Sequence, residues 1–375
     1  MSRTLVTALK FAVSLGVVAW LVWLAWDDVP ELLRQEKRWG LLAAASGMIL
    51  AMVVATFVRW WMLIRALGMD FHLRDALRLG FVGYLFNFVS LGSVGGDLFK
   101  AVFIAREQPG RRAEAVASVI IDRIIGLYGL FVVATVAVLW EGSYQSEARE
   151  VRVVSQFVLL GFGVGGAGIL MMLIPGFTQG RMSRRLAHLP RVGPLIGRLL
   201  GAIRMFRERL GTVAAALLIS VFVHVGTTCG FFWIAGGLSL PAPTLGQHLF
   251  VVPLTLLANA VPLPMGGLGA GELALDILYQ HTANIVEGSG LIVVIGYRVA
   301  TIFVAAVGVV YYLANRTFMN RVLENEDEIE SLEDSLNEET LEGEPLHDQG
   351  TSDSDHKADS PNGGKAGKSH RAQLH

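Results

Sequence analysis

Apolar residues form long, nearly uninterrupted runs along this chain, separated by short segments that carry most of its charged residues. Each run is about twenty residues long, which is enough for one helix to cross a hydrocarbon core about 30 Å thick. The pattern predicts an all-α integral membrane protein with six transmembrane helices, at residues 8–26, 40–58, 116–140, 153–174, 212–235 and 292–314. The composition agrees, because 53% of the residues are hydrophobic and only 17% are charged.

Two further apolar stretches, at residues 79–94 and 249–261, are shorter and end in Gly or Pro residues. A helix of about sixteen residues reaches only about 24 Å, which is less than the hydrocarbon thickness. Non-helical backbone at membrane depth is tolerated only where protein or a wet cavity satisfies its polar groups. We therefore expect two re-entrant broken helices whose Gly-rich ends lie in the protein interior.

These two stretches belong to a duplicated motif. Each copy of the motif begins at an asparagine, Asn87 or Asn259, and ends at a carboxylate, Asp97 or Glu272. An arginine follows each carboxylate after 26 positions, inside a long apolar run: Arg123 in the first copy and Arg298 in the second. We assign repeat A to about residues 40–140 and repeat B to about residues 212–314. Duplicated, interrupted hydrophobic segments of this kind indicate the binding site of a transporter.

The distribution of Lys and Arg predicts the orientation. Residues 59–78, 100–112 and 175–210 are rich in Arg, whereas residues 237–289 contain no Lys or Arg. Because basic residues mark the cytoplasmic side, both termini are expected to be cytoplasmic, and the two repeats to have opposite orientations. Inverted repeats are common in secondary transporters, which alternate access around a site near the bilayer midplane.

Two segments outside the repeats are strongly charged. The linker at 178–210 alternates Leu, Ile and Phe with Arg, as in an amphipathic helix that lies on anionic lipids, although a pure topology signal explains it equally well. Residues 322–375 contain 15 acidic and 4 basic residues and almost no aromatic ones. We expect residues 321–375 to form a disordered, acidic cytoplasmic tail.

Ionisable groups inside a span cost about 2.5–3.5 kcal/mol on insertion scales and are functional candidates. A guanidinium is a natural partner for a phosphate, so Arg123 and Arg298 are candidate phosphate-binding residues. Asp97 and Glu272 can balance these arginines in an empty site or accept the amine of a cationic headgroup. The alternative is that Asp97–Arg123 and Glu272–Arg298 are fixed ion pairs that hold the broken helices.

Other residues of the motifs complete the candidate substrate-binding site. Gly96, Gly267 and Gly269 would let backbone N–H groups approach an anion. Asn87 and Asn259 either cap the broken helices or contact the ligand. Two other charged side chains need separate explanations. Asp122 points to a different helix face from Arg123 and requires its own partner, either inside or outside the site. Arg59 is expected to reach the headgroups at the cytoplasmic boundary, with contact to the substrate as the alternative.

Signatures of several other functions are absent from the sequence. The sequence has no Walker loop, so ATP hydrolysis is not expected, and no nucleic-acid-binding signature. Its histidines do not have the spacing of metal ligands, and the single cysteine, Cys229, excludes an internal disulfide. We therefore expect no metal and no cofactor.

Taken in order, the motifs resemble a known family. They are Arg59-Trp-Trp-Met-Leu-Ile-Arg65, Gly95-Gly-Asp-Leu-Phe-Lys-Ala101, Asp122-Arg123, Pro262-Leu-Pro-Met-Gly-Gly-Leu-Gly-Ala-Gly-Glu272 and Tyr297-Arg298. Their order and spacing over residues 1–320 resemble the lysylphosphatidylglycerol synthetase transmembrane-region family, the flippase-like membrane domain of multiple-peptide-resistance proteins and stand-alone relatives. Where the family often has arginine, this chain has Lys100, which keeps the charge but lacks a planar fork.

The resemblance implies a polytopic domain of the cytoplasmic (inner) membrane that handles lipids. It favours a flippase-like transporter that binds an anionic-headgroup lipid, such as aminoacyl-phosphatidylglycerol or a polyprenyl-phosphate-linked lipid, and translocates it without ATP. The alternative is a membrane transferase or transferase subunit, of the phosphatidylglycerol lysyltransferase or polyprenyl-phosphate glycosyltransferase type. Only the acidic tail follows the last apolar run, so lipid synthesis would require a separate soluble or membrane synthase as partner.

Overall fold

The computed structural model describes residues 36–89, 95–107, 111–173, 206–260, 270–285 and 287–314. Within these ranges the regular structure is entirely helical. The long helices are α3 (Trp39–Ala66), α6 (Arg112–Glu141), α7 (Arg149–Leu173), α11 (Leu210–Gly237) and α14 (Ser289–Ala314). The shorter ones are α4 (Leu73–Val89), α5 (Gly95–Glu107), α12 (Leu245–Ala260) and α13 (Ala270–Ala283), together with the 3-10 turn η2 (Ser143–Gln145).

All five long helices are apolar enough, over at least 22 residues, to cross a membrane. They coincide with five of the six predicted spans, while the first predicted span, residues 8–26, lies outside the described residues. Helix α7 illustrates the membrane character, because it packs mainly on α6 and exposes Phe157, Leu160 and Val164. A helix that is apolar all round and still exposed is suited to lipid rather than water.

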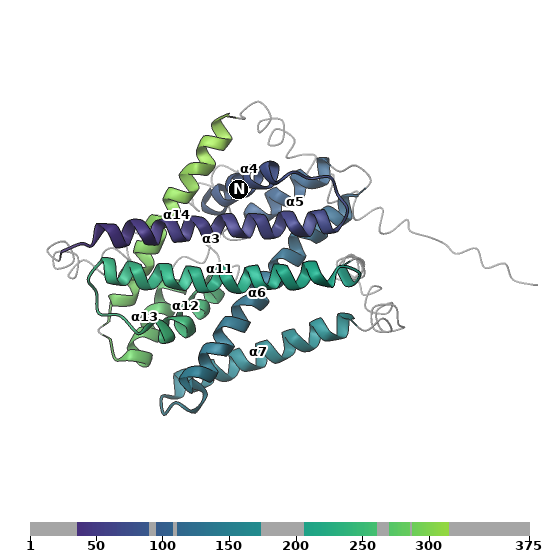
Figure 1. The fold of residues 1–375 in the computed structure, drawn as a ribbon. Helices are drawn as coiled ribbons and strands as arrows, with labels where there is room; N and C mark the ends of the chain where they lie inside the picture. Colours follow the sequence, from purple (N-terminus) through teal and green to yellow (C-terminus); the bar gives the residue numbers. More distant parts are fainter. Residues whose placement is uncertain are drawn as a thin grey trace, which may run out of the picture.

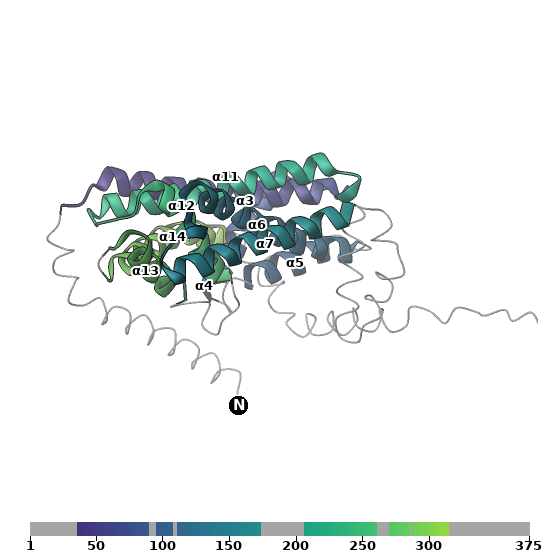
Figure 2. The same cartoon turned by 90° about the horizontal axis from the view of Figure 1, so that it is seen from below.

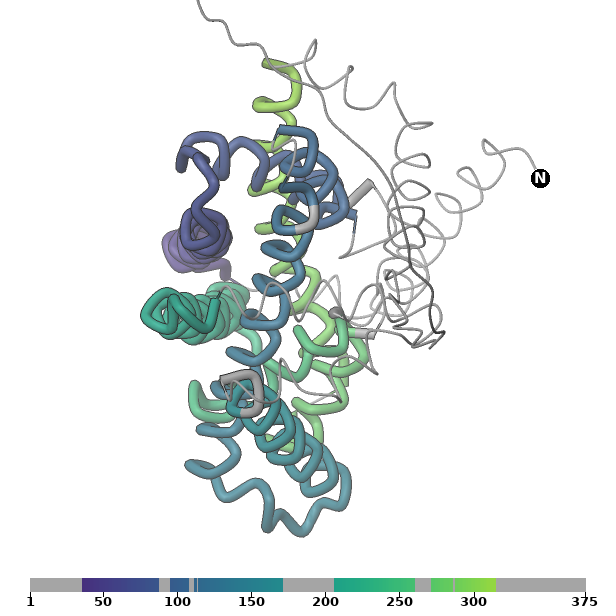
Figure 3. The backbone as a smooth tube through the Cα atoms, turned by 90° about the vertical axis from the view of Figure 1, so that its right-hand side faces the viewer, coloured from purple at the N-terminus to yellow at the C-terminus, as the bar shows by residue number. Residues whose placement is uncertain are grey.

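Helices α3 and α11 lie side by side along their whole length and form one layer of the molecule (Figure 1). Glycines of α11 make this close approach possible: a Cβ atom at Gly226 would lie 2.3 Å from the Met52 sulfur, and one at Gly230 would lie 3.0 Å from Ile49. Small residues let transmembrane helices pack with their backbones close together. Helix α6 passes beside the pair and leads to α7 at one edge (Figure 3).

The four shorter helices lie behind this layer (Figure 2). Helix α4 packs on α5 and on α14, while α12 packs on α13 and on α6. Helix α4 has 17 residues and α12 has 16, so each is shorter than the hydrocarbon core at a rise of about 1.5 Å per residue. Their lengths match the prediction of two short helices, and the residues that follow them, 90–94 and 261–269, lie outside the described residues.

Candidate functional site

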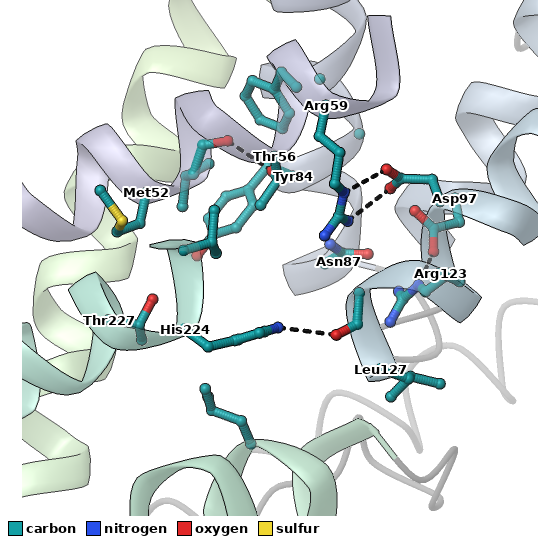
Figure 4. A pocket seen from close by; sticks show the side chains of 18 of the residues that line it. Met52, Thr56, Arg59, Tyr84, Asn87, Asp97, Arg123, Leu127, His224 and Thr227 are labelled. Atoms are coloured by element: carbon teal, nitrogen blue, oxygen red, sulfur yellow. Dashed lines mark hydrogen bonds and ion pairs between the residues drawn. The ribbon is translucent and has the colours of Figure 1, made fainter. Parts of the chain in front are cut away.

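A cavity of about 310 Å³ lies among α3, α4, α5, α6, α11, α12 and α14. Its lining combines apolar side chains with charged residues that come from several helices (Figure 4). The charged residues that line it are Arg59, Asp97, Lys100, Asp122 and Arg123. The cavity therefore brings together one predicted acid–arginine pair and a second pair that the sequence did not connect.

Asp97 lies in the first turn of α5 and contacts two cations. One oxygen accepts from Lys100 Nζ at 2.7 Å, and the other accepts from Arg123 Nε. The Lys100 ammonium also lies 5.2 Å from the centre of the Trp60 ring, in a cation–π contact. The side chain of Arg123 is 38% exposed, whereas those of Asp97 and Lys100 are 16% and 12% exposed. Arg123 therefore has accessible surface with which to reach a ligand.

The connection from α4 to α5 depends on Asn87 and Gly96. The Asn87 Oδ1 atom accepts a hydrogen bond from the Gly96 backbone N–H at 2.9 Å. A Cβ atom at Gly96 would lie 2.0 Å from the carbonyl oxygen of Gly83, so only glycine fits at this point. Asn87 thus caps a backbone group at the start of α5, which supports the capping interpretation, and its side chain also lines the cavity.

A second, deeper ion pair joins α3 to α6. Arg59 donates from Nε to one oxygen of Asp122 at 2.7 Å and from Nη2 to the other at 3.0 Å, while Nη1 donates to Ser220 Oγ at 2.6 Å. Arg59 is 5% exposed and Asp122 is 7% exposed. The expectation that Asp122 has a partner of its own is confirmed. The expectation that Arg59 reaches the lipid headgroups is wrong, because α3 continues to Ala66 and keeps Arg59 inside the helical body.

Glu272 and Arg298 form the equivalent pair in the second copy of the sequence motif. Arg298 donates from Nε to Glu272, whose side chain is only 1% exposed. Asn259 again lies against the glycine that precedes the acid, since a Cβ atom at Gly271 would lie 2.4 Å from its amide. Among the described residues, the cavity lining includes Asn259 and Tyr297 but neither Glu272 nor Arg298. Gly267 and Gly269, the other candidates in this motif, lie outside the described residues.

Sequence reasoning missed further polar residues of the cavity, among them His224 and Tyr84. The Nε2 atom of His224 lies 2.9 Å from the carbonyl oxygen of Gly126, which requires Nε2 to carry the proton (Figure 4). Both residues lie within apolar helices, and only the packing of these helices reveals that they line a common space. Within the described part of the chain, no group of three or more His, Cys, Asp or Glu side chains is arranged to hold a metal ion.

The charges that line the cavity do not cancel. Arg59, Lys100 and Arg123 are cations, whereas Asp97 and Asp122 are the two carboxylates. The lining of the cavity therefore has three cations and two carboxylates, among apolar helices where electrostatic interactions are stronger than in water. Such an arrangement is suited to holding an anion.

These observations define an all-helical, multi-pass membrane protein with a cavity that charged residues line. The chain matches the family described as Lysylphosphatidylglycerol synthase TM region over residues 8–308, and it belongs to this family. None of the curated proteins or solved structures compared with the chain matches it.

Proposed function

We propose that this protein binds a lipid with an anionic headgroup and moves it across the cytoplasmic membrane without ATP. The observation that carries the proposal is the pair of cations, Lys100 and Arg123, that both contact Asp97 and line the cavity. A phosphate group is the natural anion for this pair, because Arg offers a planar fork and Lys a point charge.

An inverted-repeat architecture would supply the route. The proposal is supported by a reciprocal pattern of contacts, in which α4 packs on the last helix of the other half, α14, while α12 packs on α6. It is supported further by the two acid–arginine pairs, each of which joins a short helix to a long one across the same 26-residue interval. In this arrangement α4–α5 and α12–α13 enter the membrane from opposite sides as re-entrant hairpins, and the cavity lies between them.

Charge supports the orientation with both termini in the cytoplasm. Arg65, Arg74 and Arg78 lie around the junction of α3 and α4, while the segments that flank α12–α13, residues 238–244 and 284–288, contain no Lys or Arg. By the positive-inside rule the α3–α4 junction faces the cytoplasm. The lipid would be delivered there by a separate soluble or membrane synthase.

Reconstitution tests the proposal. Purified protein in liposomes should move a fluorescent phosphatidylglycerol between leaflets without nucleotide, as measured by quenching of the outer leaflet with a membrane-impermeant reductant. Arg123→Ala should reduce the rate by about tenfold or more, because an ionic hydrogen bond to phosphate contributes roughly 1.5–3 kcal/mol. Leu160→Ala on the exposed face of α7 is the matched control and should retain the rate.

Two outcomes would count against the proposal. Lipid movement no faster than in protein-free liposomes, by protein that remains folded, would reject the transport function. Chemical modification of the headgroup by the purified chain alone would identify a transferase instead.

A further inference from the structure

A second hollow of the molecule is an apolar groove of about 450 Å³ where α3, α11 and α14 meet. Its lining residues recur every three or four positions along α3 and α14, and none of them lines the charged cavity. All are apolar except Lys37 and Ser46, and the Ser46 hydroxyl donates to the Leu42 carbonyl oxygen of its own helix. Trp39 and Phe303 are 74% and 67% exposed, so the groove is open on the outer surface of the helical body.

The described chain begins at one end of this groove. The carbonyl oxygen of Glu36 accepts a hydrogen bond from Ser239 Oγ at 2.8 Å, and the Arg38 N–H donates to the Gly237 carbonyl oxygen at 2.9 Å. These two bonds hold the start of the chain against the end of α11, next to Leu238, which lines the groove. The residues that precede Glu36 therefore join the described structure at the groove.

A transmembrane helix is predicted just before this point, at residues 8–26. Only nine residues, 27–35, separate it from Glu36, and an extended chain of that length spans at most about 30 Å. In the proposed orientation the predicted helix ends on the outer side of the membrane, where α3 begins, so the two are antiparallel. Consecutive elements with a short connection usually lie next to each other. The predicted helix is therefore the segment of this chain best placed to reach the groove.

Small residues occur on both sides of such a contact. Ala43 and Ser46 of α3 line the groove. In the predicted helix, Ala12, Gly16 and Ala19 follow one another at intervals of four and three positions, which places them on one helix face. Small residues at an interface let transmembrane helices approach closely. Fluid acyl chains do not require small residues, so the two matching faces favour a helix rather than lipid as the occupant.

We propose that residues 8–26 pack into the groove as a helix antiparallel to α3, with their small-residue face toward α3 and α14. The groove is then a docking site within the chain. Tyr297 of α14 lines the charged cavity, whereas Val299 and Phe303 of the same helix line the groove. The docked helix supports α14 from the membrane side, and this role is independent of whether the protein moves lipid.

Depth in the membrane identifies residues that should meet. Trp26 ends the predicted helix and Trp39 begins α3, and tryptophan is enriched at the membrane–water interface. Ala19 lies seven positions before Trp26, and Ser46 lies seven positions after Trp39. At a rise of 1.5 Å per residue, both lie about 10 Å from the interface. The proposed packing therefore makes Ala19 and Ser46 neighbours.

Disulfide cross-linking of the full-length protein in membranes tests this packing. In a Cys229→Ser background, the pair Ala19→Cys, Ser46→Cys should form a disulfide within one chain on oxidation, as identified by peptide mass spectrometry. The pair Ala19→Cys, Phe157→Cys is the matched control, because Phe157 is 54% exposed and lies eight positions from the start of α7. The first pair should give about tenfold more product, since a disulfide requires Cβ atoms about 3.5–4.5 Å apart.

A second pair and two contrary results complete the test. Trp23→Cys with Ala43→Cys probes the same contact one turn nearer the interface, and it should also cross-link within one chain. It replaces the first pair if that variant does not fold. Disulfide-linked dimers of the Ser46→Cys variant would place a second copy in the groove and overturn the proposal. Product no greater than in the control for both pairs, in protein with an unchanged thermal unfolding midpoint, would assign the groove to lipid and overturn it as well.

Discussion

At the scale of single residues, the guanidinium of Arg59 links three helices. It makes two hydrogen bonds to Asp122 of α6 and a third to Ser220 of α11, and both charged side chains are buried. A Cβ atom at Gly126 would lie 3.1 Å from the same guanidinium, so this glycine makes room for it. The network fixes α3, α6 and α11 relative to one another on one side of the cavity.

Breaking this pair should be strongly destabilising. Arg59→Met leaves Asp122 as a buried charge without a partner, and removing one member of such a pair costs about 3–5 kcal/mol. The double variant Arg59→Met, Asp122→Leu removes both charges and should recover most of that loss. Thermal unfolding in detergent measures both effects, and a single variant as stable as the unaltered protein would show that the pair is not structural.

Gly96 provides a residue-scale test of the α4–α5 contact. Gly96→Ala places a methyl group 2.0 Å from the Gly83 carbonyl oxygen, so the backbone must shift, at a cost of about 1–3 kcal/mol. The matched control is Gly47→Ala in α3, where a Cβ atom meets no other atom within 4 Å. That substitution should stabilise the helix by about 0.5–1 kcal/mol, because alanine has the higher helix propensity. Opposite shifts in the unfolding temperature are the expected result, and equal shifts would contradict the tight contact.

At the scale of helices, the sequence predicted the elements better than the contacts between them. The apolar runs located α3, α6, α7, α11 and α14 because a membrane span needs a minimum length of apolar residues. The predicted span ends at residue 58, just before Arg59, whereas α3 continues to Ala66. Arg59 is instead compatible with the helix interior because Asp122, 63 positions later, neutralises it. A pairing over that distance depends on tertiary packing, which hydropathy does not report.

The same limitation applies to the cavity. The 26-residue interval identified both acid–arginine pairs, since each joins a short helix to the next long one. It did not show that only the first pair lines the cavity together with Arg59 and His224. That difference follows from how α3, α6 and α11 pack, and the pattern of one chain segment contains no signal for it.

The re-entrant arrangement makes a prediction for whole helices. In a Cys229→Ser background, cysteines at His72 and Glu107, which flank α4–α5, should both react with a membrane-impermeant maleimide from the cytoplasmic side. Cysteines at Thr244 and Glu287, which flank α12–α13, should both react from the outside, because the two hairpins enter from opposite faces. All four positions are exposed. Labelling of the two ends of either hairpin from opposite sides would show instead that its helices cross the membrane.

At the scale of the whole molecule, the helices surround a cavity that three cations and two carboxylates line, and the proposed cargo is an anionic lipid. Transport of a monoanionic lipid without a compensating ion moves one elementary charge across the membrane. An imposed potential of 100 mV therefore changes the free energy of transfer by about 2.3 kcal/mol, which corresponds to roughly a 50-fold change in the equilibrium distribution. A zwitterionic lipid that uses the same route would carry no net charge and would not respond.

Proteoliposomes with a potassium-diffusion potential test this voltage dependence directly. With the lumen negative, the fluorescent phosphatidylglycerol should accumulate in the outer leaflet, toward the limit set by the applied voltage, while fluorescent phosphatidylcholine should distribute as it does at zero potential. The response of the anionic lipid should disappear when the potential is collapsed with an ionophore. Movement of phosphatidylglycerol that is fast but insensitive to voltage would show that a cation crosses with it, because only charge compensation removes the electrical work from the transfer of an anion.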